Sequence, residues 1–254
     1  MDKWAGDLTI GVGWVYYDGP VGHTEFHQHY AVQICFPSAG LLHIETTEES
    51  RSVETVLVIG SNVSHRLSTP ATIAKILYVE PSLISQSARR LQVDGIEIPD
   101  LSPLQSQAID NMFAAAQDSR GPDFGLELAR VIWPAEASHA FLSIDNRIRK
   151  ALKNIELSED LNLNLDQIAM GSGLSASRFR HLFSAQVGMP IKSYLLWIKL
   201  QRALQSLAVD SSLTNAAHKA GFADSSHLSR TFKRTFGLAP ADLNRNANIT
   251  SRAR

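Results

Sequence analysis

Three histidines and one glutamine early in the chain have the types and spacing to bind a metal ion or a small molecule. His27 and His29 are two residues apart, so a strand would place both imidazoles on one face, and Gln33 shares their parity. His65 follows a predicted turn over residues 60–64. Imidazole nitrogens with an oxygen ligand suit iron, manganese, nickel or zinc. A metal site and a purely structural role stay open, but we favour a small-molecule pocket and expect no cofactor.

A second set of polar side chains lies within an internal repeat. Positions 48 residues apart pair small with small and apolar with apolar residues, and after one inserted residue the spacing becomes 49. Such matching over roughly 24 positions indicates two copies of one structural unit. The pairs are Leu165 with Leu213, Ala169 with Ala217, Gly173 with Gly221, Leu174 with Phe222, Phe179 with Leu228, Phe183 with Phe232, and Val187-Gly188 with Phe236-Gly237.

The sequence of each copy predicts that it forms a short helix, a glycine turn and a second helix. Asn164, in capping-box spacing with Gln167, and Ser212 are the expected N-caps of the two short helices. Ser175 and Asp224 are the expected N-caps of the helices that follow. A small residue, a glycine turn and a capped second helix are typical of the helix-turn-helix, whose second helix enters a major groove.

The polar faces of the two second helices predict the DNA contacts. Arginine can bond guanine bidentately and so discriminate between bases by about 1–3 kcal/mol. Contacts to phosphate carry affinity without sequence information, and we expect this role for Lys233 and Arg234, while for Arg230 it stays open. The full set is Ser177, Arg178, Arg180 and His181 in the first copy, and Ser225, Ser226, His227, Ser229, Arg230, Lys233 and Arg234 in the second.

The charge distribution agrees with a nucleic-acid partner for the C-terminal part. The 254 residues carry a formal net charge of −1, but residues 1–144 hold 8 Lys and Arg against 17 Asp and Glu, and the remainder hold 16 against 8. Opposite charge on the two parts is expected when only one of them approaches a polyanion. A predicted helix over residues 191–207 joins the copies, and about 17 residues at about 1.5 Å each give about 25 Å, compatible with the roughly 34 Å of one duplex turn.

Residues 145–245 resemble the DNA-binding domain of the AraC/XylS family of bacterial transcription regulators. The most specific stretch is Ala220–Pro240, and the first copy together with Gly188 before Pro190 fits as well. Lys199, where the family usually has Arg, and Leu228, where it usually has Phe, depart from the pattern. The resemblance implies a monomer that presents two recognition helices to successive major-groove segments of double-stranded DNA.

The N-terminal part predicts short strands over residues 8–80, with the turn chemistry of a sandwich or barrel. It resembles the cupin barrel and the sensor domain of many AraC-type regulators, in which a His pair and a later His occupy these places. Gln33, where a metal-binding cupin would prefer Glu, and the lack of Pro before His65 depart from the metal-binding pattern. Trp14 and Tyr78 are further expected pocket residues. Predicted helices between residues 83 and 134 could cover the barrel or form a dimer seam.

The sequence therefore predicts an α+β multidomain protein. We expect a cupin-like β-barrel sensor at 1–82, a helical segment at 83–134, a linker at 135–144, an all-α double helix-turn-helix at 145–245 and a tail at 246–254. No apolar run reaches the roughly 18–20 residues that span a membrane, and a single Cys35 excludes an internal disulfide. We expect a cytoplasmic protein without a membrane partner.

The predicted function is a transcription regulator that answers to a small-molecule effector. The resemblance implies activation through RNA polymerase as the commoner outcome, and the helical segment allows a homodimer. No nucleophile with its base, phosphate loop or dinucleotide fingerprint is present in the sequence, so we do not expect an enzyme. The alternative is a metal-binding cupin enzyme, or a metal sensor, fused to a DNA-binding module.

Overall fold

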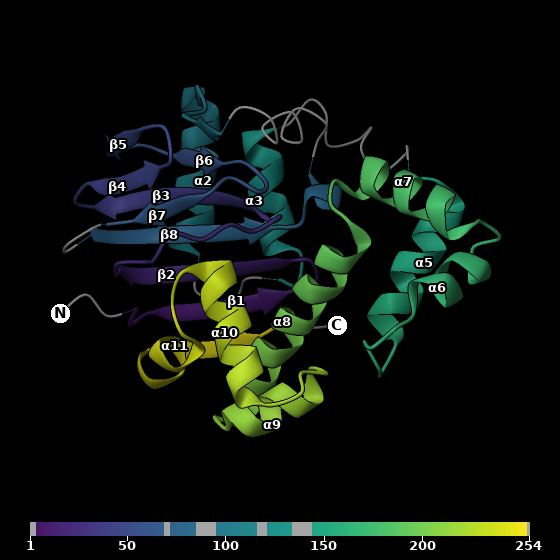
Figure 1. Ribbon diagram of the computed structural model, residues 1–254. Helices are drawn as coiled ribbons and strands as arrows, with labels where there is room; N and C mark the ends of the chain where they lie inside the picture. The colour runs from purple at the N-terminus through teal and green to yellow at the C-terminus, as the bar shows by residue number, and fades with distance from the viewer. Residues whose placement is uncertain (1–3, 69–71, 85–94, 116–120, 134–143, 253–254) are drawn as a thin grey trace.

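A computed structural model describes residues 4–68, 72–84, 95–115, 121–133 and 144–252. Its strands lie almost wholly in the N-terminal part and its helices in the C-terminal part, so the predicted α+β class is confirmed (Figure 1). The predicted linker at 135–144 falls outside the described residues except for Ile144. None of the helices in the described ranges has both the length and the apolar character needed to cross a membrane.

The strands form two sheets rather than one closed barrel. The larger sheet has the order β10-β1-β2-β8-β3-β6-β9, and the smaller one has the order β5-β4-β7. Both are antiparallel except for the parallel pair β1–β10. The strands are β1 (Asp7–Gly11), β2 (Trp14–Val21), β3 (Val32–Ala39), β4 (Leu42–Thr46), β5 (Ser50–Val53), β6 (Leu57–Ile59), β7 (His65–Leu67), β8 (Thr72–Val79), β9 (Ile96–Glu97) and β10 (Asn248–Ser251). We call β1–β9 the β region.

One face of the larger sheet is covered by α3 (Phe124–Ile132), which buries Phe124, Leu128 and Ala129 against it. The preceding helix, α2 (Pro103–Ala114), packs on α3 and buries only Ile109, and its Leu104 is 84% exposed. Of the two roles expected for the helical segment, α3 therefore covers the sheet, and α2 is the one with an outward face. A short 3-10 helix, η1 (Pro81–Leu83), follows β8.

The opposite face belongs to a core that the two parts of the chain share. Val15 and Tyr17 of β2 and Tyr78 of β8 lie in the same buried apolar cluster as Phe232 and Phe236. The smaller sheet covers part of this face, and the C-terminal helices cover another part (Figure 1). The predicted tail contributes β10, which pairs with the edge strand β1. The second helix-turn-helix unit and the end of the chain are thus attached to the β region.

The C-terminal part consists of the two predicted copies and the helices around them. The first unit is α6 (Leu165–Gly171) and α7 (Ala176–Val187), and the second is α9 (Leu213–Lys219) and α10 (Ser225–Phe236). The joining helix is α8 (Ile191–Val209), while α5 (Asn146–Leu157) precedes the units and α11 (Pro240–Asn246) follows them. The fold is the predicted duplication.

Local signals explain where these helices begin and end. Ser175 accepts a hydrogen bond from the Arg178 amide, and Asp224 accepts one from the His227 amide, as expected for N-caps. Helices α7 and α10 each end at a glycine with positive φ, Gly188 at 84° and Gly237 at 71°. This backbone conformation is strained for a residue that has a Cβ. Asn164 also caps its helix, but it binds the Asp166 amide, and the expected reciprocal pair with Gln167 is not part of the cap.

The strands predicted over residues 8–80 begin with a hairpin. Its two strands, β1 and β2, are joined by a turn that contains Val12 and Gly13. Gly13 has a φ of 75°, which breaks the extended backbone, and Val12 is 43% exposed. Trp14 therefore starts the second strand of the pair.

Candidate nucleic-acid interface and histidine cluster

The predicted recognition faces are on the surface. In α7 the side chains of Ser177, Arg178, Arg180 and His181 are exposed, while Phe179 and Phe183 are buried. In α10 the exposed residues are Ser226, His227, Arg230, Lys233 and Arg234, while Ser225 and Ser229 are partly exposed. Each unit thus presents polar and basic side chains opposite a phenylalanine-rich core.

The second unit is attached to the β region through the C-terminal end of α10. The Glu25 amide donates to the Gly237 carbonyl at 2.8 Å, and the Lys233 ammonium lies 2.6 Å from the Glu25 carboxylate. A Cβ on Gly237 would lie 2.5 Å from both the Glu25 carbonyl oxygen and His27 Nδ1. Only glycine permits this approach, so the recognition helix ends directly on the segment before β3. We call this contact the seam.

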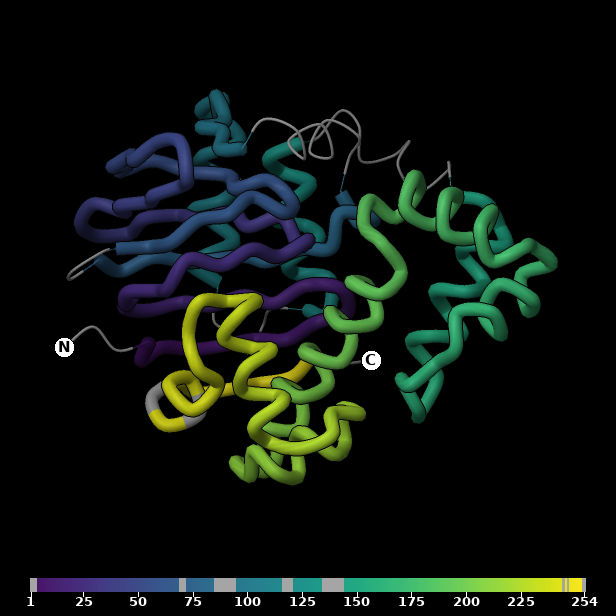
Figure 2. The backbone as a smooth tube through the Cα atoms, viewed as in Figure 1, coloured from purple at the N-terminus to yellow at the C-terminus, as the bar shows by residue number. Residues whose placement is uncertain are grey.

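The two recognition helices run in clearly different directions. In Figure 1, α7 runs across the view beside α5 and α6, whereas α10 runs up it in front of the sheets; the tube in Figure 2 follows the same courses. Helices that enter successive major-groove segments on one face of a duplex should have similar orientations relative to the DNA axis, because the groove repeats every turn. In this arrangement only one of the two recognition helices can have that orientation at a time.

Two residues of α8 position the second unit, a role that was not predicted for them from the sequence. Lys199 Nζ donates to the Gly221 carbonyl at 2.8 Å and to Asn162 Oδ1 at 2.7 Å, so it holds the turn of the second unit. Gln201 Nε2 donates to the carbonyls of Gly11 and Trp14, at 3.2 and 3.3 Å, and ties α8 to the β1–β2 hairpin. A buried glutamine on the apolar face of a helix was the one available signal for this contact.

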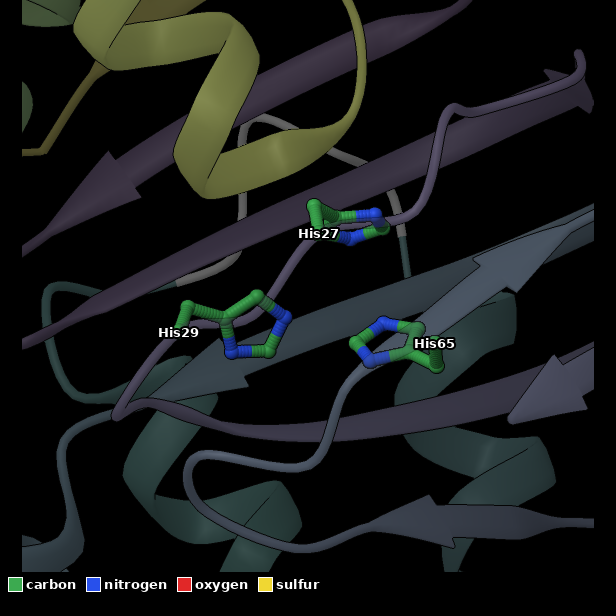
Figure 3. Close-up of side chains that lie close together, drawn as sticks. All are labelled: His27, His29 and His65. Carbon is green, nitrogen blue, oxygen red and sulfur yellow. The ribbon is translucent and has the colours of Figure 1, made fainter. Parts of the chain in front are cut away.

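The histidine cluster is assembled by the strands as predicted. The backbones of His27 and His65 exchange two hydrogen bonds of 2.9 Å, which makes their rings cross-strand neighbours with centroids 4.2 Å apart. His29 Nε2 and His65 Nε2 lie 3.0 and 3.1 Å from Gln33 Oε1. All four side chains are at most 4% exposed, and the three rings face one another (Figure 3). We call these four residues the His cluster.

Burial keeps the cluster neutral. Loss of hydration, followed by the nearby charge of His29, lowers the pKa of His27 to about 3. Burial likewise lowers the pKa of His29, and that of His65 well below its usual value. Each Nδ1 lies 2.8–2.9 Å from a backbone carbonyl, of Glu25, Ala31 and Val63 in turn. The three Nε2 atoms, one per ring, are the ones left to face the interior.

The other two expected pocket residues lie on different faces of the sheet. Tyr78 packs edge-on against His29, with ring centroids 5.2 Å apart, and therefore belongs beside the His cluster. Trp14 lies on the α3 side, where its ring donates to the Pro122 carbonyl and meets Phe124. The structure does not bring Trp14 to the cluster, because neighbouring strand positions alternate between the faces.

Two of the spaces where the β region meets the C-terminal helices lie beside Tyr78 or His29. One has a volume of about 30 Å³ and is lined by Tyr17, Tyr78, Phe232 and Phe236 among others. The other, of about 150 Å³, lies next to His29 and is lined also by Trp197 and Arg234. Pockets for drug-sized ligands usually have about 300–1,000 Å³. In this arrangement both spaces suit a water molecule or a very small ligand.

Known proteins resemble the chain in two separate ways. A family described as a helix-turn-helix domain matches residues 157–246. The arabinose operon regulatory protein of Escherichia coli K12 is 33% identical over 104 residues, which is 39% of this chain and 35% of that protein. The transcriptional activator NphR of a Rhodococcus species is 35% identical over 82 residues, 32% of this chain and 24% of that protein. The chain thus spans only about a third or less of these relatives' length.

The whole fold is similar to that of ToxT from Vibrio cholerae. An apo ToxT variant superposes with a TM-score of 0.62 at 12% identity, covering 94% of this chain and 98% of that one. Wild-type ToxT with a bound unsaturated fatty acid gives 0.58 at 13% identity, covering 93% and 95%. This likeness concerns the fold. Over residues 157–246 this chain contains a helix-turn-helix domain, and that part of its sequence is similar to the arabinose operon regulatory protein.

Proposed function

We propose that the protein is a sequence-specific, double-stranded-DNA-binding transcription regulator. The observation that carries this is the duplication itself: two helices, each capped at its first turn, display basic and hydroxyl side chains outward. Helices of this kind read base edges in the major groove. Relatives over the matched residues include transcriptional activators, so activation through RNA polymerase is the proposed outcome.

Within the proposed interface, the arginines nearest the start of each recognition helix read bases. Arg178 and Arg180 lie in the first two turns of α7, and Arg230 lies in the second turn of α10. Lys233 and Arg234 lie in the last turn of α10, where they are placed for phosphate rather than base contacts. The N-terminal residues of a recognition helix are those that reach the bases.

The β region is the proposed sensor of a small effector, and the seam is its route to the DNA-binding part. The shared core, the Glu25 contacts and β10 make the position of the second unit depend on the β region. We assign no catalytic role to the protein and place it in the cytoplasm. Its exposed helix α2 is the proposed surface for a homodimer.

Selection of bound duplexes from a random pool, with the full chain, tests the proposal. We expect one enriched motif and binding that weakens steeply with salt, because lysine and arginine release counterions from phosphates. Arg180→Ala should lose about 1–3 kcal/mol of discrimination on that motif. Arg51→Ala is the matched control, since it removes a positive charge from the β region. The absence of any enriched motif would refute sequence-specific binding.

A further inference from the structure

The tautomers of the His cluster follow from its backbone contacts. Each Nδ1 faces a carbonyl oxygen, which can only accept, so each Nδ1 carries the hydrogen. A neutral ring then has a bare lone pair on Nε2. All three rings are buried, so the Nε2 lone pairs of His27, His29 and His65 are shielded from solvent. Gln33 Oε1, a fourth acceptor, lies 3.0–3.1 Å from two of them.

Four acceptors without a donor require either a different amide orientation or a cation. With its amide turned over, Gln33 would donate to His29 and His65, and its oxygen would accept from the Cys35 thiol, now 3.2 Å from Gln33 Nε2. That arrangement leaves His27 Nε2 buried without a hydrogen-bond partner. An orphaned buried acceptor is costly, so the turned amide satisfies two of the three histidines. A cation satisfies all four groups.

The distances also fit a cation. Metal–nitrogen bonds of about 2.0–2.1 Å place neighbouring ligand atoms about 3.0–3.4 Å apart. The Gln33 oxygen already has this separation from two nitrogens, those of His29 and His65. One ring nitrogen from each of the three histidines lies within 4.8 Å of the other two. The backbone carbonyls at Nδ1 are the partners that orient metal-binding imidazoles. We propose that His27, His29, His65 and Gln33 bind one divalent transition-metal ion, and that the seam transmits its binding to α10.

The seam carries the second half of the proposal, which rests on the proposed function. His27 Nδ1 is hydrogen-bonded to the Glu25 carbonyl, and Glu25 in turn contacts Gly237 and Lys233. Drawing His27 Nε2 toward a shared ion moves the ring that lies beneath the end of α10. Because Glu25 is bonded directly to Gly237 and Lys233, this movement is passed to the end of the recognition helix.

The metal half is tested on the full chain, purified without a histidine tag and stripped with a chelator. Co²⁺ is titrated and followed by its visible absorption, then displaced with Zn²⁺. We expect one ion per chain. His27→Ala and His65→Ala should each weaken binding at least about tenfold, since even the partners that orient ligands are worth about 10–100-fold. Gln33→Glu, which adds a carboxylate ligand, should bind more tightly.

Controls separate the site from folding and from other histidines. His43→Ala removes an imidazole bonded to Ser52 on the smaller sheet, and should bind Co²⁺ like the wild type. The Gln33→Glu variant keeps all three histidines, so it tests the site even where an alanine variant does not fold. No Co²⁺ binding by folded wild type would overturn the proposal, and so would binding that His27→Ala and His65→Ala leave unchanged.

The coupling half is read from DNA affinity on the selected duplex with and without Zn²⁺. We expect Zn²⁺ to change the affinity of the wild type at least about fivefold, the lower end of typical coupling between sites, and to leave that of His65→Ala unchanged. An equal affinity with and without bound Zn²⁺ would overturn the coupling but not the DNA-binding function. That function fails separately, if no motif is enriched at all.

Discussion

The two helix-turn-helix units are copies in sequence but differ in what they contact. In the first, α7 ends at Val187-Gly188, and the helix contacts α5, α8 and the short helix η1. In the second, α10 ends at Phe236-Gly237, and that end lies on the β region. In the second copy the final glycine thus makes a direct contact between the two parts of the chain.

This difference teaches where control over DNA binding is located. Phe236 packs against Tyr78 and His29, with ring centroids 5.5 and 6.3 Å apart, whereas its counterpart Val187 is a smaller, fully buried residue without a ring. In the proposed complex with DNA, the second unit changes its direction relative to the first, and the seam is what holds it in the present direction.

The largest expected effect comes from truncating Phe236, the buried residue next to the seam. Phe236→Ala removes a ring that is 5% exposed and should lower the free energy of unfolding by about 3–5 kcal/mol. Val187→Ala, its counterpart, removes two buried methyl groups and should cost about 2 kcal/mol. Chemical denaturation of both variants measures the difference. Equal losses would mean that the seam adds nothing to the second unit.

A second pair of variants compares the two glycine caps. Gly188→Ala should cost about 1–2 kcal/mol, the strain of a side chain at positive φ. Gly237→Ala carries the same strain and also places its Cβ 2.5 Å from two groups of the β region, so it should open the seam. Hydrogen exchange of the Glu25 amide, which donates to Gly237, should accelerate in that variant alone. Unchanged exchange would show that the contact tolerates the methyl group.

The arginines of the two recognition helices should differ in how much each contributes to discrimination between bases. Arg180→Ala should lose about 1–3 kcal/mol of discrimination between bases in an otherwise wild-type chain. Arg230→Ala should lose less, because α10 is held in a different direction from α7. Combined with Gly237→Ala, the Arg230 variant should lose as much as the Arg180 variant. Binding curves on the selected duplex and on one mismatched duplex give these numbers, and equal initial losses would contradict the asymmetry.

The smallest effect belongs to the ion pair at the seam. Lys233 and Glu25 have side chains that are 47% and 68% exposed, so their pairing should contribute less than about 1 kcal/mol and fade with added salt. A double-mutant cycle with Lys233→Ala and Glu25→Ala measures it. A coupling energy above that value, or one insensitive to salt, would assign the pair a larger part in holding α10.

The sequence predicted what local chemistry determines. The caps at Ser175 and Asp224, the glycine turns and the paired histidines depend on residue types within a few positions of each other, and all are found in the structure. The seam could not be predicted, because Glu25 and Gly237 are far apart in the chain and neither is unusual for its surroundings. Trp14 was expected at the pocket but lies on the α3 side, because the face that a strand residue takes depends on its register in the sheet.

Footprinting on the selected duplex tests the central claim most directly. The wild-type chain should protect one major-groove segment strongly, through α7, and the adjacent one weakly. Gly237→Ala should extend strong protection to both segments, while Gly188→Ala should not. Full protection of both segments by the wild type, unchanged in Gly237→Ala, would contradict the claim that the β region holds the second recognition helix.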